Sequence, residues 1–168
     1  MNVSIVALAL LSTLVAQDTG PATLAGVALG GPAKDAAAAH KGAASKGAWG
    51  AGFAWNAPGT GSVRITADDD GNVAIVDVVP ASPSIDLPAA KAFPVAQGHE
   101  KYSELSTFIE SDTCRASKPG DACYAYTLDD GELVLQFGAS GTGPLHEAIW
   151  GDRSTLKTLG IIQAGASI

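Results

Sequence analysis

The chain has 168 residues, a length typical of one domain, and its 46% apolar content is that of a globular protein. Its formal net charge of −7 disfavours nucleic acid as a partner, because an acidic surface repels the phosphate backbone. The sequence carries no complete active-site signature, so it does not specify an activity by itself.

The first predicted element is a targeting segment. Residues 3–16 form an uncharged run of apolar and small residues, VSIVALALLSTLVA. This length suits the hydrophobic region of a secretory signal peptide and is short for crossing a bilayer. We therefore expect residues 1–16 to be a signal peptide, with no stable membrane span after cleavage. Two alternatives stay open: an uncleaved anchor that extends through Gly31, and a buried first strand or helix of a cytosolic domain.

Residues 17–48 are rich in alanine and glycine and show no clear apolar period. Such a composition is typical of flexible linkers. We therefore expect a tether over 17–48, followed by a single α+β domain over 49–168.

Two segments of this domain predict β-hairpins with Asp-Gly turns. Residues 63–79 place two β-rich runs around Asp70 and Gly71, and residues 124–137 repeat the layout around Asp130-Gly131. Aspartate and glycine tolerate the positive φ that tight turns require. A sheet built from these two hairpins is therefore expected.

Three other segments predict short helices. Asp86 can cap a helix over 87–93, and residues 99–109 place apolar side chains at helical spacing. Asp152 can cap a third helix, which Gly160 would end. Hairpins mixed with a few short helices, without regular βαβ alternation, predict an α+β fold with a small antiparallel sheet.

The two cysteines, Cys114 and Cys123, flank a Lys-Pro-Gly-Asp sequence at 118–121 that is typical of a type II turn. Such a turn brings the flanking segments together as an antiparallel pair, at a separation that suits a disulfide. The spacing is too wide for a redox CxxC motif, and no other ligand lies at zinc-site spacing. We predict a structural disulfide, which is consistent with export.

The segment 66–77 has the layout of a calcium-binding loop, with Asp68, Asp70 and Asp77 as candidate ligands. Thr66 stands where such loops begin with aspartate, and the flanks are β-rich instead of helical. An acidic hairpin turn without metal is the favoured interpretation, and a calcium-stabilised module is the alternative.

Three residues could form a hydrolytic or metal site if the fold unites them: His99, Glu104 and His146. The segment that begins HEKYSE is not an HExxH zinc motif, because Ser103 occupies its fifth position. Adjacent His-Glu pairs also point to different faces of a helix or strand. Catalysis at this set is therefore only an alternative hypothesis.

Trp49, Trp55 and Trp150 could form a surface patch that binds sugar or protein, although burial in the core is the favoured interpretation. Taken together, the sequence predicts a small exported protein, periplasmic or extracellular, with a binding or structural role and no evident catalytic site. Its expected partner is an unknown protein or small ligand of the cell envelope, and no cofactor is expected apart from the calcium alternative.

Overall fold

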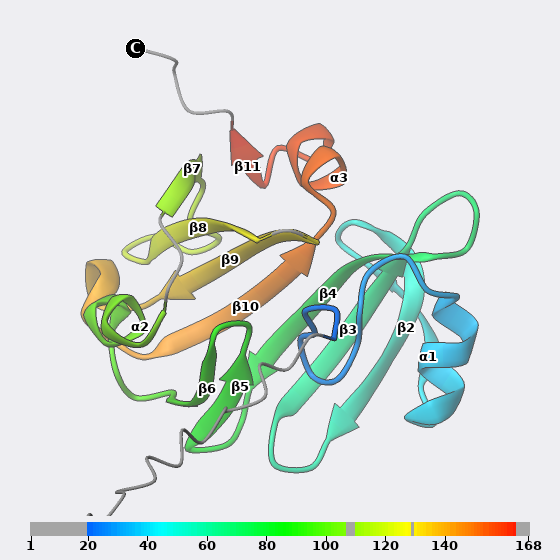
Figure 1. The fold of residues 1–168 in the computed structure, drawn as a ribbon, viewed down its shortest axis with the longest axis horizontal. Coiled ribbons are helices and arrows are strands. Elements are labelled where there is room, and N and C mark those ends of the chain that lie inside the picture. The colour runs from blue at the N-terminus through cyan, green and yellow to red at the C-terminus, as the bar shows by residue number, and fades with distance from the viewer. Residues whose placement is uncertain (1–19, 107–109, 129, 164–168) are drawn as a thin grey trace, which may run out of the picture.

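The structure is a computed structural model that describes residues 20–106, 110–128 and 130–163. Within these residues, nine antiparallel strands form one sheet in the order β1-β2-β3-β4-β10-β9-β8-β7-β11, and two more form a separate hairpin, β5-β6 (Figure 1). The strands are β1 Ala43–Gly47, β2 Gly50–Ala57, β3 Gly61–Ala67, β4 Val73–Pro80, β5 Ser84–Leu87, β6 Ala90–Pro94, β7 Glu110–Cys114, β8 Ala122–Leu128, β9 Gly131–Phe137, β10 Leu145–Gly151 and β11 Ile162–Gln163. The helices are α1 Ala33–Ala39, α2 His99–Leu105 and α3 Arg153–Thr158, with a short 3-10 turn η1 at Ala139–Gly141.

The large sheet has two halves of the same layout. In each half a helix is followed by four strands that pair in sequence, α1 with β1–β4 and α2 with β7–β10. The last strands of the two halves, β4 and β10, pair antiparallel, with Asp77 opposite Ile149 and Val76 opposite Trp150. The β4–β10 pairing therefore joins the two halves into one sheet.

Alternation along the strands buries apolar side chains on both faces of the sheet. One face, called here the hairpin face, is covered by residues 20–31, by α1 and α2, and by β5–β6; its buried side chains include Val63, Val76, Tyr126, Leu135 and Trp150. The opposite face packs against α3 and β11, where Leu156 and Ile162 cover Ile75, Val134 and Ile149. This two-sided burial explains why β4 is apolar almost throughout.

The structure confirms an antiparallel, mostly β fold of roughly α+β type. Both predicted hairpins are present, as β3–β4 and β8–β9. The predicted third helix is also present as α3, where the Thr155 N–H donates to the Asp152 carboxylate at 2.9 Å and Gly160 follows the helix with φ of 70°. Bonds from Ser154 and Thr155 hold the pKa of Asp152 below its usual value.

The helix predicted over 87–93 is wrong, since this segment forms the β5–β6 hairpin. Pro88 and Ala89 form its turn, and Asp86 accepts a hydrogen bond from the Ala92 N–H at 2.8 Å instead of capping a helix. The helix predicted over 99–109 is shorter than expected, because α2 ends at Leu105 and residues 107–109 lie outside the described part.

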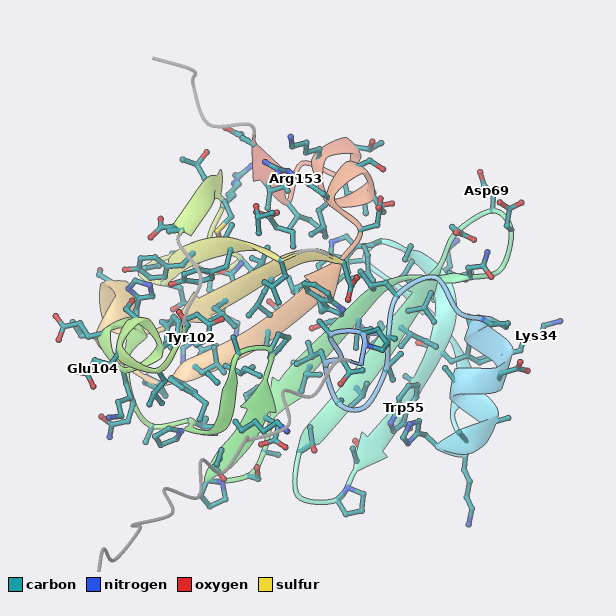
Figure 2. All side chains as sticks on the ribbon, viewed as in Figure 1. Lys34, Trp55, Asp69, Tyr102, Glu104 and Arg153 are labelled. Carbon is teal, nitrogen blue, oxygen red and sulfur yellow. A yellow bond between two sulfur atoms is a disulfide. The ribbon has the colours of Figure 1, made fainter. Side chains whose placement is uncertain are left out.

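The expected tether over 17–48 is also corrected for residues 20–47, which belong to the folded domain. Leu24 is fully buried and pairs with Val27 in an isolated bridge, and α1 buries Ala33 and Ala37. Trp55 from β2 lies beside α1 (Figure 2). Small alanine side chains allow the helix to approach the sheet closely, a packing role that composition alone does not distinguish from a linker. The predicted signal peptide, residues 1–16, lies outside the described residues.

Candidate functional site

The predicted disulfide between Cys114 and Cys123 is confirmed, with Cα atoms 5.6 Å apart. The turn before β8 has the expected geometry, because the Asp121 N–H donates to the Lys118 carbonyl at 3.2 Å and Gly120 has φ of 83°. Closing so short a loop stabilises the fold by roughly 2–3 kcal/mol in the chain-entropy account.

The three candidate calcium ligands are not brought together. In the β3–β4 turn, Asp68 accepts hydrogen bonds from the backbone N–H groups of Asp70 (3.0 Å) and Asn72 (2.8 Å). Asp77 lies farther along β4, buried beside Glu147. The described residues contain no group of three or more His, Cys, Asp or Glu side chains placed to hold a metal ion. Within the turn, the Asp68 carboxylate therefore holds the backbone of residues 70 and 72.

The set His99, Glu104 and His146 is likewise not united, since each side chain has a separate partner. Glu104 lies on the exposed side of α2 and pairs with Lys101 at 3.1 Å (Figure 2). His146 contacts Asp121, with Nδ1 2.9 Å from the carboxylate.

His99 belongs instead to an aromatic cluster at the start of α2. Its ring stacks on Tyr124, its Nε2 contacts the Tyr126 hydroxyl, and the same nitrogen lies 3.3 Å from the Ser103 Oγ. Burial lowers the pKa of His99, so its imidazole is neutral near pH 7.

The three tryptophans do not form a surface patch. Trp150 is fully buried and Trp55 is 8% exposed, both in the core of the hairpin face, and Trp55 stacks on His40. Trp49 is half-buried and packs against the apolar cluster of the opposite face. The favoured expectation of core tryptophans therefore holds for Trp55 and Trp150.

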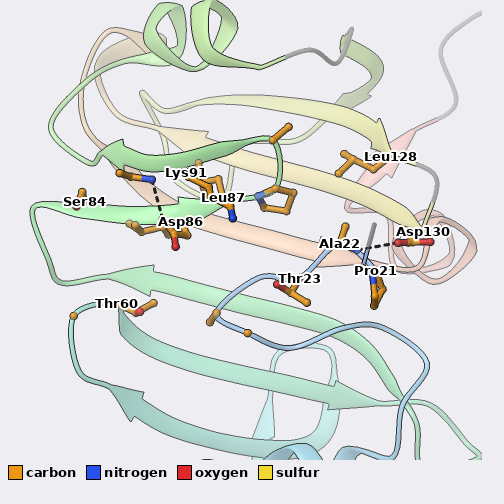
Figure 3. Close-up of a pocket in the computed structure, with 18 residues that line it drawn as sticks. Pro21, Ala22, Thr23, Thr60, Ser84, Asp86, Leu87, Lys91, Leu128 and Asp130 are labelled. Carbon is orange, nitrogen blue, oxygen red and sulfur yellow. Dashed lines mark hydrogen bonds between the residues drawn. The ribbon is translucent and has the colours of Figure 1, made fainter. Parts of the chain in front are cut away.

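A cavity of about 770 Å³ lies on the hairpin face, between segments that are distant in sequence. Its walls are residues 20–26 (the N-terminal arm), the β5–β6 hairpin, the β2–β3 turn at Gly59 and Thr60, and the β8–β9 turn at Asp130 (Figure 3). The Ala22 N–H donates to the Asp130 carboxylate at 2.9 Å, which fixes the arm beside the sheet. The cavity therefore results from tertiary packing of four separate segments.

The lining of the cavity combines an apolar base with polar groups around it. Ile85, Leu87 and Leu128 are each more than nine-tenths buried and supply the apolar part. The polar groups are the carboxylates of Asp86 and Asp130, the Lys91 amine and the hydroxyls of Thr23, Thr60 and Ser84. An apolar surface with a few placed polar groups is the usual composition of a ligand site.

Three alanines of the cavity wall have left-handed backbone conformations: Ala25 with φ of 52°, Ala89 with 63° and Ala92 with 53°. Ala25 precedes Gly26 in the turn between Leu24 and Val27. Each such alanine costs roughly 1–2 kcal/mol relative to an ordinary conformation. Backbone strain of this kind concentrates at functional sites, where the surrounding fold maintains it. Of the six non-glycine residues with positive φ in the described part of the chain, these three line this cavity, and together with its mixed lining they make it the candidate functional site.

A second polar feature lies on the opposite face of the sheet. Asp77 is 7% exposed, and burial together with the adjacent Glu147 carboxyl, which is hydrogen-bonded to it, raises the pKa of Asp77 to about 7, against a smaller opposing effect of Arg64. The Ser117 hydroxyl donates to Glu147 at 3.3 Å. Asp77 Oδ1 is buried without a hydrogen-bond partner in the described part of the chain. Because this atom is inaccessible, the pair affects stability more directly than ligand binding.

Sequence reasoning missed both features. No local pattern signals the cavity, because its walls meet only after the N-terminal arm, the β2–β3 turn, the β5–β6 hairpin and the β8–β9 turn have packed together. Asp77 did carry a signal: it is the one charged residue in the β-rich run VAIVDVV, whose continuous apolar character indicates a strand buried on both faces.

No protein-family model, curated protein or solved structure matches the chain. Among the described residues, no helix combines the length and apolar character that crossing a membrane requires.

Proposed function

We propose that this chain is an exported binding protein, periplasmic or extracellular, and that it holds a ligand or a segment of a partner protein in the cavity beside the N-terminal arm. The observation that carries the proposal is the convergence of three left-handed alanines on one cavity, Ala25 from the N-terminal arm and Ala89 and Ala92 from the β5–β6 hairpin. Walls held in strained conformations are already organised before a ligand arrives, which reduces the entropy lost on binding.

The dimensions and chemistry of the cavity support the same proposal. Its volume of about 770 Å³ is within the range that encloses small ligands and short peptide segments. The buried Ile85, Leu87 and Leu128 supply apolar contact, and Asp86 and Asp130 supply charged acceptors. This combination gives both affinity and orientation to a bound group.

Export is supported by the apolar run at residues 3–16 and by the Cys114–Cys123 disulfide, because disulfides persist mainly in oxidising compartments. The test is the intact mass of protein recovered from its host, measured with and without reduction before thiol alkylation. We expect a mass that lacks the first sixteen or so residues and thiols that react only after reduction. A full-length mass with freely alkylated thiols would contradict export.

Binding in the cavity is tested by native mass spectrometry of the protein purified from its host. Thr60, a half-buried residue of the β2–β3 turn, lines the cavity, so Thr60→Trp should fill part of it and remove any bound mass. The matched control is Thr158→Trp, at an exposed residue of α3 outside the cavity, which should retain the bound mass. Equal occupancy in both variants would place the ligand elsewhere.

A second candidate function is hydrolysis at the start of α2. It is favoured by one observation: the neutral His99 has its Nε2 3.3 Å from the Ser103 hydroxyl, a geometry in which histidine can accept the proton of a serine nucleophile. The Tyr126 hydroxyl contacts the same nitrogen and competes for it. Activity on p-nitrophenyl acetate that Ser103→Ala and His99→Gln both abolish would support this function, and activity unchanged by either substitution would end it.

A further inference from the structure

We infer that the cavity takes an extended peptide, which adds as a strand to the open edge of β5 and directs separate basic side chains toward Asp86 and Asp130. This inference rests on the proposed function and specifies the class of ligand. It follows from the pairing of β5, from the length of its edge and from the charges around it.

Among the described residues, the backbone of β5 has a partner on one side only. In the described residues β5 and β6 form a two-stranded sheet, with Ile85 opposite Phe93. The Val95 N–H donates to the Pro83 carbonyl at 2.9 Å, so the odd-numbered residues 83 and 85 face β6. Because bonding alternates along an antiparallel strand, Ser84 directs its backbone groups to the other edge, and Asp86 lies at the register shift between Ile85 and Leu87.

That other edge lies at the cavity. Every residue of β5 lines it, and the N-terminal arm and Thr60 face the hairpin from across the cavity (Figure 3). At about 3.3 Å per residue, β5 offers an edge of about 13 Å, enough to pair with four residues of an extended chain. The Ser84 carbonyl currently accepts the Ser82 hydroxyl, a contact that can exchange for a peptide N–H. Strand addition of this kind obtains affinity from backbone bonds and specificity from side-chain contacts.

The charged residues that line the cavity, two aspartates (Asp86 and Asp130) against one lysine (Lys91), favour a basic peptide. Asp86 and Asp130 each use one carboxylate oxygen to hold a backbone N–H, of Ala92 and Ala22 respectively, which fixes both carboxylates in place. A carboxylate has about four acceptor positions, so each can also accept from a lysine or arginine side chain. The net charge of −7 adds a long-range attraction for basic partners.

The test uses a defined probe, the capped peptide Ac-TKTKTKT-amide, titrated into the disulfide-bonded protein and followed by amide chemical shifts and calorimetry. Two matched peptides serve as comparisons: Ac-TETETET-amide, with reversed charge, and the lysine peptide with alternate backbone amides methylated. We expect the lysine peptide to bind at the cavity and the methylated peptide to bind about tenfold more weakly, because its backbone donors are lost. The glutamate peptide should not bind measurably.

The protein variants separate the charge contribution from the fold. Asp86→Asn keeps an acceptor for the Ala92 N–H while removing the charge. It should lower the affinity for the lysine peptide roughly threefold. Asp68→Asn is the matched control, since Asp68 holds backbone N–H groups in the same way but lies outside the cavity, and it should bind like the wild type. Shifts at the cavity with equal affinity for methylated and unmethylated peptides would overturn strand addition while leaving the proposed function intact. Shifts confined to other surfaces, or no binding, would overturn the inference. A bound mass unaffected by Thr60→Trp would instead overturn the proposed binding site.

Discussion

The carboxyl groups of Asp77 on β4 and Glu147 on β10 are hydrogen-bonded to each other across the strand pairing that joins the two halves of the sheet. Two carboxyl groups in hydrogen-bond contact need a proton between them, since both cannot ionise there without strong repulsion. Asp77 is the buried partner, and burial together with the Glu147 carboxyl raises its pKa to about 7. The proton that Asp77 holds below that pH therefore stabilises the β4–β10 pairing.

Stability should therefore fall as the pH rises. The pKa of Asp77 is raised in the folded state, so its contribution is fully present below the unfolded value of 3.8 and is lost progressively until the pH reaches about 7. The loss should be a few kcal/mol, about 4 at most. Urea unfolding between about pH 4 and pH 8 measures it, with Asp77→Asn as the test variant because a neutral amide does not titrate.

Asp77→Asn should flatten this part of the pH profile and be more stable than the wild type at pH 8. Asp86→Asn, an exposed control of the same chemistry, should keep the wild-type slope. If the wild type and Asp77→Asn unfold with parallel pH profiles, Asp77 does not hold a proton at neutral pH.

Removing the disulfide should lower the free energy of unfolding by roughly 2–3 kcal/mol, the loop-closure contribution of the bond. The variant is Cys114→Ala with Cys123→Ala, measured by urea unfolding without reductant. Wild-type protein with reduced thiols should match it. No difference between oxidised and reduced protein would mean that the turn at 118–121 alone maintains the β7–β8 pairing.

Ala89→Gly should stabilise the fold by about 1 kcal/mol, because glycine adopts the left-handed conformation of residue 89 without steric cost. Ala96→Gly, at an exposed residue without positive φ, should instead destabilise slightly, since glycine loses more entropy on folding. If the strain serves binding, Ala89→Gly should also lower the affinity of the protein for the lysine peptide. A melting temperature that falls in Ala89→Gly would contradict the strain argument.

Calcium should leave the melting temperature unchanged, because Asp77 lies along β4 beside Glu147 and so does not join Asp68 and Asp70 in the turn. Thermal unfolding with calcium and with chelator measures this directly. A calcium-dependent rise that Asp68→Ala with Asp70→Ala abolishes would revive the calcium-stabilised module.

Local sequence signals predicted local structure well. The two hairpins, the Asp152 cap and the Cys114–Cys123 pair depend on residues close to one another in the sequence, and all are present. The segment 87–93 failed because Pro88 suits both the first turn of a helix and a tight hairpin turn, and packing of Ile85 and Phe93 into the core decides between them. The β4–β10 pairing and the cavity connect residues more than sixty positions apart, a separation at which turn chemistry carries no information.

The most direct test of the binding account is amide hydrogen exchange on protein purified from its host, compared with the same protein unfolded and refolded with its disulfide intact to release any non-covalent ligand. Bound ligand should slow exchange in residues 20–26 and in β5 of the purified sample, and refolding should remove that protection. Identical exchange in the two samples, or protection that lies around Asp77 and Glu147 instead, would contradict a ligand site at this cavity.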